Sequence, residues 1–176
     1  MSQVEFSIEI GEGFAGAGPN AAHINTVLGL RDGPVGTAFA TALAQPTPGH
    51  VPFLAVWSPN VPVEPATLFV NKATIINDSH GTLTWGAAQA GVAAGVTEYA
   101  ANNLNSRIVS QLVLIVAVWV NPDADDADSV FANNQAATAT ALQRGAGRAT
   151  SDADATSAIS ALRSGARPSN PYFAPR

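Results

Sequence analysis

The longest apolar run in the sequence is LVLIVAVWV, at residues 112–120. Its nine residues are too few for a membrane-spanning helix, which needs about 20. Continuous apolar runs of this length are typical of strands that are buried on both faces. We therefore expect a central strand over residues 111–120, with the other elements packed around it.

Further strands are indicated upstream of this run. Residues 4–10 alternate apolar and polar side chains with a period of two, the pattern of a strand with one solvent-exposed face. The other strands are expected over residues 22–30, 51–57 and 68–76. The glycine-rich residues 11–16 formally match a dinucleotide-binding pattern, but no helix follows them, and we interpret them as a loop.

Helices are expected where apolar residues recur every three to four positions. They are predicted from Pro34 to the prolines at 46 and 48, over residues 84–102, in the Ala-rich segment after residues 121–126, and over residues 152–163. Residues 58–65 are interpreted as a loop, 77–81 as a turn and 169–173 as an extended tail. Strands and helices alternate without a strict βαβ rhythm. This order predicts an α+β fold, a mixed β-sheet with packed helices, in a single domain over residues 1–176.

The composition limits the classes of partner. Charged residues make up only 12% of the chain and hydrophobic residues 47%, against about 25% charged in an average globular protein, so we expect contacts between subunits. A net charge of -5 without a Lys/Arg cluster argues against nucleic acid. The absence of cysteine excludes disulfides and thiolate metal sites. The first residues lack the pattern of a secretory signal, which favours a cytoplasmic protein.

Polar side chains inside two apolar strands are the first candidates for a functional site. Strand periodicity places His23 and Asn25 on one face of their strand, and Lys72 and Thr74 on one face of theirs. Lys72 is also the only lysine of the chain. Burying an unpaired polar group costs about 1–3 kcal/mol. The four side chains therefore indicate either a pocket or subunit interface, or a hydrogen-bonded structural network.

Other polar residues are assigned structural roles. His50 and His80 lie in predicted loops, and we interpret both as solvated turn residues. The acidic residues between 123 and 128 lack the glycine and the glutamate of a calcium-binding loop, so helix capping explains them better. The three histidines have no metal-binding spacing.

Five short blocks occur in an order that resembles one known family. They are AHI at residues 22–24, LAV at 54–56, SPNVP at 58–62, TLFVNKATI at 67–75 and GAAQAGVA at 86–93, with looser similarity at 131–138 and 170–174. Together they resemble the formaldehyde-activating enzyme family. The resemblance covers most of the chain and is densest between residues 23 and 96.

The resemblance implies an activity in one-carbon metabolism. It implies a lyase that condenses formaldehyde with the co-substrate tetrahydromethanopterin, giving the methylene derivative and water without a metal. The position of His23 matches the proposed general acid, and the substrate-binding positions match Asn25, Leu54, Lys72, Thr74 and Gln89. The implied fold has a left-handed βαβ crossover of the ribosomal protein domain 2-like type. The implied assembly is a homopentamer, with the pterin between neighbouring subunits.

Asn25 departs from the family pattern, which has an aspartate two residues after the histidine. Asparagine keeps the size and an acceptor oxygen but loses the charge, and charge-assisted hydrogen bonds are roughly twice as strong as neutral ones. Two interpretations remain open. The site is an intact but weaker version of the family site, or the chain is a diverged paralogue that binds formaldehyde, a pterin or a folate without turnover.

Overall fold

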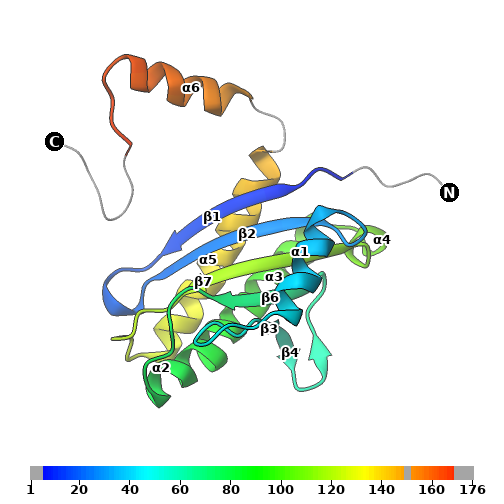
Figure 1. Cartoon of the computed structure of the whole chain (residues 1–176), viewed down its shortest axis with the longest axis vertical. Helices are drawn as coiled ribbons and strands as arrows, with labels where there is room; N and C mark the ends of the chain where they lie inside the picture. The colour runs from blue at the N-terminus through cyan, green and yellow to red at the C-terminus, as the bar shows by residue number, and fades with distance from the viewer. Residues whose placement is uncertain (1–5, 149–151, 169–176) are drawn as a thin grey trace.

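A five-stranded mixed sheet forms the centre of the protein in the computed structural model, which describes residues 6–148 and 152–168. From one edge to the other the strands are β1 (Glu9–Ala15), β2 (Ala22–Leu30), β7 (Leu112–Trp119), β6 (Ala66–Asn71) and β3 (Phe53–Leu54). β7 lies in the middle, antiparallel to β2 and parallel to β6. The predicted central strand is therefore confirmed, and Figure 1 shows the strands side by side.

Helices pack on both faces of the sheet. The helices of the described residues are α1 (Pro34–Ala44), α2 (Asp78–Thr82), the π-helical segment η2 (Leu83–Ala88), α3 (Gln89–Asn103), α4 (Ser106–Val109), α5 (Ala127–Arg148) and α6 (Asp152–Arg163), and a 3₁₀ turn, η1, covers Gly18–Asn20. α3 and α5 pack together, and Figure 1 shows them behind the sheet with α1 in front. None of the helices in the described ranges is long and apolar enough to cross a membrane.

The predicted α+β class is confirmed, with helices packed on a mixed sheet. The chain leaves β6, passes through α2, η2, α3 and α4, and returns in β7, the parallel neighbour of β6. This connection is the βαβ crossover that the resemblance implies. Its left-handed sense stays a prediction, and the expected tail at residues 169–173 lies outside the described residues.

The first strand corrects the sequence analysis. It covers Glu9–Ala15, so residues 11–16 are mostly strand and the predicted loop is wrong. Gly11 and Gly13 face α5, and a Cβ on either would collide with a backbone carbonyl of that helix, at Ala141 and Ala137 respectively. The two glycines thus allow α5 to approach the sheet closely, and they do not form a turn.

A small hairpin is the second correction. Residues 51–57 do not form one strand but divide into β3 and β4 (Val56–Ser58), and β4 pairs with β5 (Val61–Pro62), inside the predicted loop. Asn60 makes the turn with a positive φ of 67°, a conformation that asparagine tolerates better than most residues. The sequence analysis missed β5 because of Pro59 and Pro62, since proline normally argues against a strand.

His80 is the third correction. The predicted turn at residues 77–81 is the start of α2, where the Asn77 side chain accepts a hydrogen bond of 2.8 Å from the His80 backbone N–H and so caps the helix. The His80 side chain is only 1% exposed, and its Nε2 lies 3.1 Å from the carbonyl oxygen of Val120. His80 is therefore a core residue and not a solvated one.

The two faces of the sheet differ in coverage. Ile24, Thr26 and Leu28 of β2 are almost fully buried on the side of α5, whereas His23, Asn25 and Val27, on the side of α1, are only half-buried. At one end of this second face Val35 of α1 packs against Gly29. The other end of the same face remains partly open.

Candidate active site

Three of the predicted site residues meet at this open end. Lys72 follows β6 directly, and its backbone N–H donates 2.7 Å to the carbonyl of Val118, which fixes it beside β7. Its Nζ donates to Oδ1 of Asn25 at 2.9 Å and lies 3.3 Å from Nδ1 of His23. The structure thus brings together His23, Asn25 and Lys72, which come from strands separated by β7.

β1 adds two residues that the sequence analysis missed. Glu12 pairs with Asn25 and Phe14 with His23 across the β1–β2 ladder. An oxygen of the Glu12 carboxylate lies 2.9 Å from Nε2 of His23, and the Phe14 ring stacks on the imidazole with centroids 4.0 Å apart. His23 is therefore held on both ring nitrogens and on one ring face. The period-two alternation of residues 4–10 continues through Gly11 and Gly13. Extending the predicted strand along it would have placed Glu12 and Phe14 on one strand face.

Burial perturbs the lysine of this cluster. Lys72 is half-buried, and loss of solvation lowers its pKa to about 8, while the nearby Glu12 carboxylate acts in the opposite direction. Desolvation disfavours the charged form of an amine. When Lys72 is protonated it donates to Nδ1 of His23, so that His23 carries its own hydrogen on Nε2, toward Glu12. A proton can then pass between Lys72 and Glu12 through the ring of His23.

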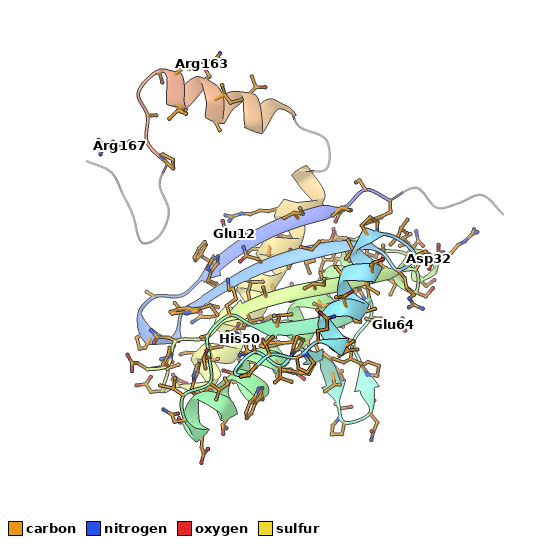
Figure 2. All side chains as sticks on the ribbon, in the orientation of Figure 1. Glu12, Asp32, His50, Glu64, Arg163 and Arg167 are labelled. Atoms are coloured by element: carbon orange, nitrogen blue, oxygen red, sulfur yellow. The ribbon has the colours of Figure 1, made fainter. Side chains whose placement is uncertain are left out.

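Thr74 does not lie on the strand face where it was predicted. β6 ends at Asn71, and the Thr74 hydroxyl lies 3.2 Å from Nε2 of His50. Nδ1 of His50 in turn hydrogen-bonds the carbonyl of Asn71 at 2.8 Å. His50 does end a turn, at the Thr47–His50 bridge, but it is half-buried with both ring nitrogens bonded, so only the solvated part of its interpretation is wrong. Figure 2 marks Glu12 on β1, at the opposite edge of the sheet from the segment that carries His50.

Leu54 and Gln89 are not part of the cluster. Leu54, which is 43% exposed, pairs with Leu68 at the sheet edge. Leu68 precedes Lys72 by four residues, which places Leu54 about 13 Å from Lys72 along the strand direction. Gln89 is 7% exposed, and its side-chain amide accepts from the N–H of Val56 and donates to the carbonyl of Val56, both at 3.1 Å. In the single chain Gln89 therefore joins α3 to the β4–β5 hairpin.

Replacing Gln89 by alanine is expected to lower the free energy of unfolding by about 2 kcal/mol, because the polar groups of Val56 lose their partner. Gln143→Ala, on the exposed side of α5, serves as the matched control and should change stability by less than about 0.5 kcal/mol. Denaturant unfolding of both variants measures the difference. Equal stabilities would mean that the Gln89 clamp contributes nothing to the fold.

A separate cleft of about 480 Å³ lies between the β4–β5 hairpin and helices α3 and α4. Its lining is mainly apolar and includes Trp57, Val63, Ala100 and Leu104. None of the predicted site residues lines it. The hydrogen-bonded group of titratable side chains lies instead at the His23 cluster. Within the part of the chain that the structure describes, no group of three or more His, Asp or Glu side chains is arranged to hold a metal ion.

Comparison with known proteins identifies similar sequences. The sequence model of the family described as Formaldehyde-activating enzyme (Fae) matches residues 10–161. The 5,6,7,8-tetrahydromethanopterin hydro-lyase of Methanosarcina barkeri is 43% identical over 136 residues, which cover 77% of this chain and 76% of that protein. The Bifunctional enzyme Fae/Hps of Methanosphaera stadtmanae is 41% identical over 137 residues, or 77% of this chain. The chain spans only 34% of the length of that bifunctional relative.

Proposed function

The chain belongs to the formaldehyde-activating enzyme family, and from this premise we propose that it condenses formaldehyde with tetrahydromethanopterin to methylene-tetrahydromethanopterin and water. The observation that carries the proposal is the position of His23, held between the Glu12 carboxylate and Lys72 at an open end of the sheet. The substrate follows the name of the hydro-lyase relative, most of whose length the chain covers.

The reaction needs a proton donor at one step. Attack of a pterin amine on formaldehyde gives a carbinolamine, and the hydroxyl of this adduct must be protonated before it can leave as water. Histidine is the side chain that most often transfers protons in enzymes, because its ring nitrogens can both donate and accept a hydrogen. We assign this role to His23. Glu12 orients the imidazole and stabilises its cationic form, as a carboxylate does in a catalytic triad.

The remaining residues are proposed to bind the substrate. Lys72 and Asn25 offer a cationic or neutral amine and an amide beside the half-exposed ring of Phe14, a combination that fits the polar edge and flat face of a heterocycle. Thr74 hydrogen-bonds His50 rather than the cluster, and its proposed contact with the pterin follows from the resemblance alone. Leu54 and Gln89 lie outside the cluster of their own chain, so their proposed contacts require a neighbouring subunit.

We propose a homopentamer with the pterin site between subunits, in the cytoplasm. The sparse charge and the exposed apolar side chains near the site, such as Ile10 at 62% exposure, support it. Light scattering is expected to give a mass close to five times the 17.9 kDa of the chain. A monomer at working concentration would contradict both the pentamer and a site shared between subunits.

Lys72→Met is expected to raise the KM for tetrahydromethanopterin about tenfold, in addition to any loss of kcat, because the pterin loses one charge-assisted hydrogen bond. Steady-state kinetics at saturating formaldehyde measures the change. Arg107→Met, in the exposed helix α4, removes a cation far from the cluster and should leave KM unchanged. An unaltered KM in Lys72→Met would remove the lysine from the pterin site.

The proposed reaction is tested by mixing the purified protein with formaldehyde and tetrahydromethanopterin and following methylene-pterin formation. The protein is expected to accelerate the condensation above its spontaneous rate, in proportion to its concentration. If it gives no acceleration at any concentration, the proposed activity is wrong and a non-catalytic formaldehyde or pterin/folate binding protein takes its place.

A further inference from the structure

Lys72 has an unusual set of partners for a lysine. Its Nζ is held by the neutral amide of Asn25 at 2.9 Å and by the imidazole of His23 at 3.3 Å. The titratable groups that face it are His23 from β2 and Glu12 from β1. Among the residues that the structure describes, no carboxylate lies within ion-pair distance of Nζ. The amine therefore sits in a hydrogen-bonded site with the Glu12 carboxylate nearby but not in contact.

This environment increases the share of uncharged amine. Burial lowers the pKa of Lys72 to about 8, so about one molecule in ten carries a neutral amine at pH 7, against about one in three thousand for an ordinary lysine. The neutral form is the nucleophile, and desolvation is a recognised way of activating a lysine toward carbonyl compounds. The sole lysine of the chain is thus poised for addition to an aldehyde.

We propose that Lys72 is a catalytic residue in this chain, one that captures formaldehyde covalently and passes its carbon to the pterin. The inference rests on the proposed function for the identity of the aldehyde and of the acceptor. The geometric basis is the placement of Nζ beside the proposed proton donor and the absence of a carboxylate partner.

Each step balances without an oxidant or reductant. The Nζ lone pair forms a bond to the formaldehyde carbon, the C=O π electrons move to oxygen, and a proton passes from nitrogen to oxygen to give a carbinolamine. Protonated His23 donates to the hydroxyl, the C–O bond breaks, and water leaves a methylene iminium on Lys72. A pterin amine adds to the methylene carbon, and the proton that it releases returns to His23. Attack by the second pterin nitrogen, with proton transfer to Nζ, breaks the Nζ–C bond and regenerates the lysine.

Capture is tested without any pterin, so it can fail or succeed independently of the proposed function. The protein and an Nα-acetylated lysine amide are treated in one tube with formaldehyde and cyanoborohydride, which converts the iminium into a stable methylamine. Because the chain has one lysine, peptide mass spectrometry assigns the label unambiguously. Lys72 is expected to react on the order of ten- to a hundredfold faster than the reference amine at pH 7, with a rate midpoint near pH 8. Equal rates for Lys72 and the reference amine would overturn the proposal.

Two variants connect the rate to the partners of Lys72. Asn25→Asp places a carboxylate at the oxygen that accepts from Nζ, which favours the charged amine, and labelling at pH 7 should fall on the order of tenfold. Asn102→Asp, an exposed change at the end of α3, should label as the natural protein does. If Asn25→Asp labels at the natural rate, the neutral partner does not activate Lys72 and the inference fails.

Transfer to the pterin is tested by isotope trapping. The protein is loaded with isotopically labelled formaldehyde and then mixed with tetrahydromethanopterin and excess unlabelled formaldehyde. The first turnover is expected to carry the label, and Lys72→Arg, which keeps the charge but has no such nucleophile, should lose both the label and most of kcat. An unlabelled first product, or full kcat in Lys72→Arg, would overturn the transfer step while leaving the proposed condensation intact. Conversely, labelled Lys72 with no methylene-pterin would contradict only the proposed condensation.

Discussion

Replacing His23 by alanine is expected to lower the kcat for methylene-pterin formation by about a hundredfold or more, the usual contribution of a positioned general acid. The loss should fall on kcat rather than on pterin affinity, because an acid acts on the departing hydroxyl in the transition state while binding is spread over other groups. Initial rates above the spontaneous background, measured over a range of pterin concentrations, separate the two parameters.

Glu12→Gln provides the graded comparison for His23. The amide keeps the size of the side chain, which lies 2.9 Å from Nε2 of His23, but it cannot stabilise the cationic ring as a carboxylate does. Its kcat should therefore lie between those of the natural protein and His23→Ala. A His23→Ala variant with unchanged kcat would remove the general-acid role and make the cluster a structural network.

Gly13→Ala is expected to lower the free energy of unfolding by about 3 kcal/mol or more, at the upper end of overpacking effects. The added Cβ would collide with the backbone carbonyl of Ala137 in α5, and a backbone atom cannot rotate away as a side chain does. β1 and α5 would have to separate, which also displaces Glu12. Denaturant unfolding monitored by circular dichroism measures the loss.

Gly147→Ala is the matched control for this prediction. It lies in the same helix, α5, and among the described residues no heavy atom outside the neighbouring backbone lies within 4 Å of the position that its Cβ would occupy. Alanine favours a helix over glycine by up to about 1 kcal/mol, so this variant should be neutral or slightly more stable. If Gly13→Ala is as stable as Gly147→Ala, the close packing of β1 against α5 is not required for the fold.

The elements that the sequence predicted well are those with long, regular patterns. β7 is a continuous apolar run, and α1, α5 and α6 each have a clear start and apolar or alanine-rich periodicity. These patterns are local, so they can be recognised without knowing what packs against them. The α+β class followed from the order of these elements along the chain.

The elements that the sequence predicted wrongly depend on contacts with distant segments. Gly11 and Gly13 suggest a loop until α5 is placed on them, and Pro62 argues against a strand until β4 pairs with it. His80 resembles a turn residue because its partner, the carbonyl of Val120, is 40 residues away in sequence. In each case a tertiary contact outweighed the local propensity.

The candidate site was predictable only in part. His23, Asn25 and Lys72 stood out as polar side chains in apolar strands, and the structure places them within hydrogen-bond reach of one another through Lys72. Glu12 was missed because its strand was taken for a loop. The two hydrogen bonds from Gln89 to Val56 could not be foreseen, because no pattern in α3 indicates which backbone groups it meets.

Asn25 acquires a definite partner in the structure. The family pattern has an aspartate here, and a carboxylate at this position would face Nζ of Lys72 rather than an apolar wall. The amide instead leaves Lys72 without a charged acceptor. We therefore expect the departure from the pattern implied by the resemblance to act first on the charge state of Lys72 and only through it on His23.

The most direct test of the account is a crystal structure of the protein with bound methylene-tetrahydromethanopterin. The account predicts that the two nitrogens joined by the methylene group lie within hydrogen-bond reach of His23, with Lys72 beside them. A product whose methylene bridge lies in the cleft lined by Trp57 and Leu104, away from His23 of every subunit, would contradict it.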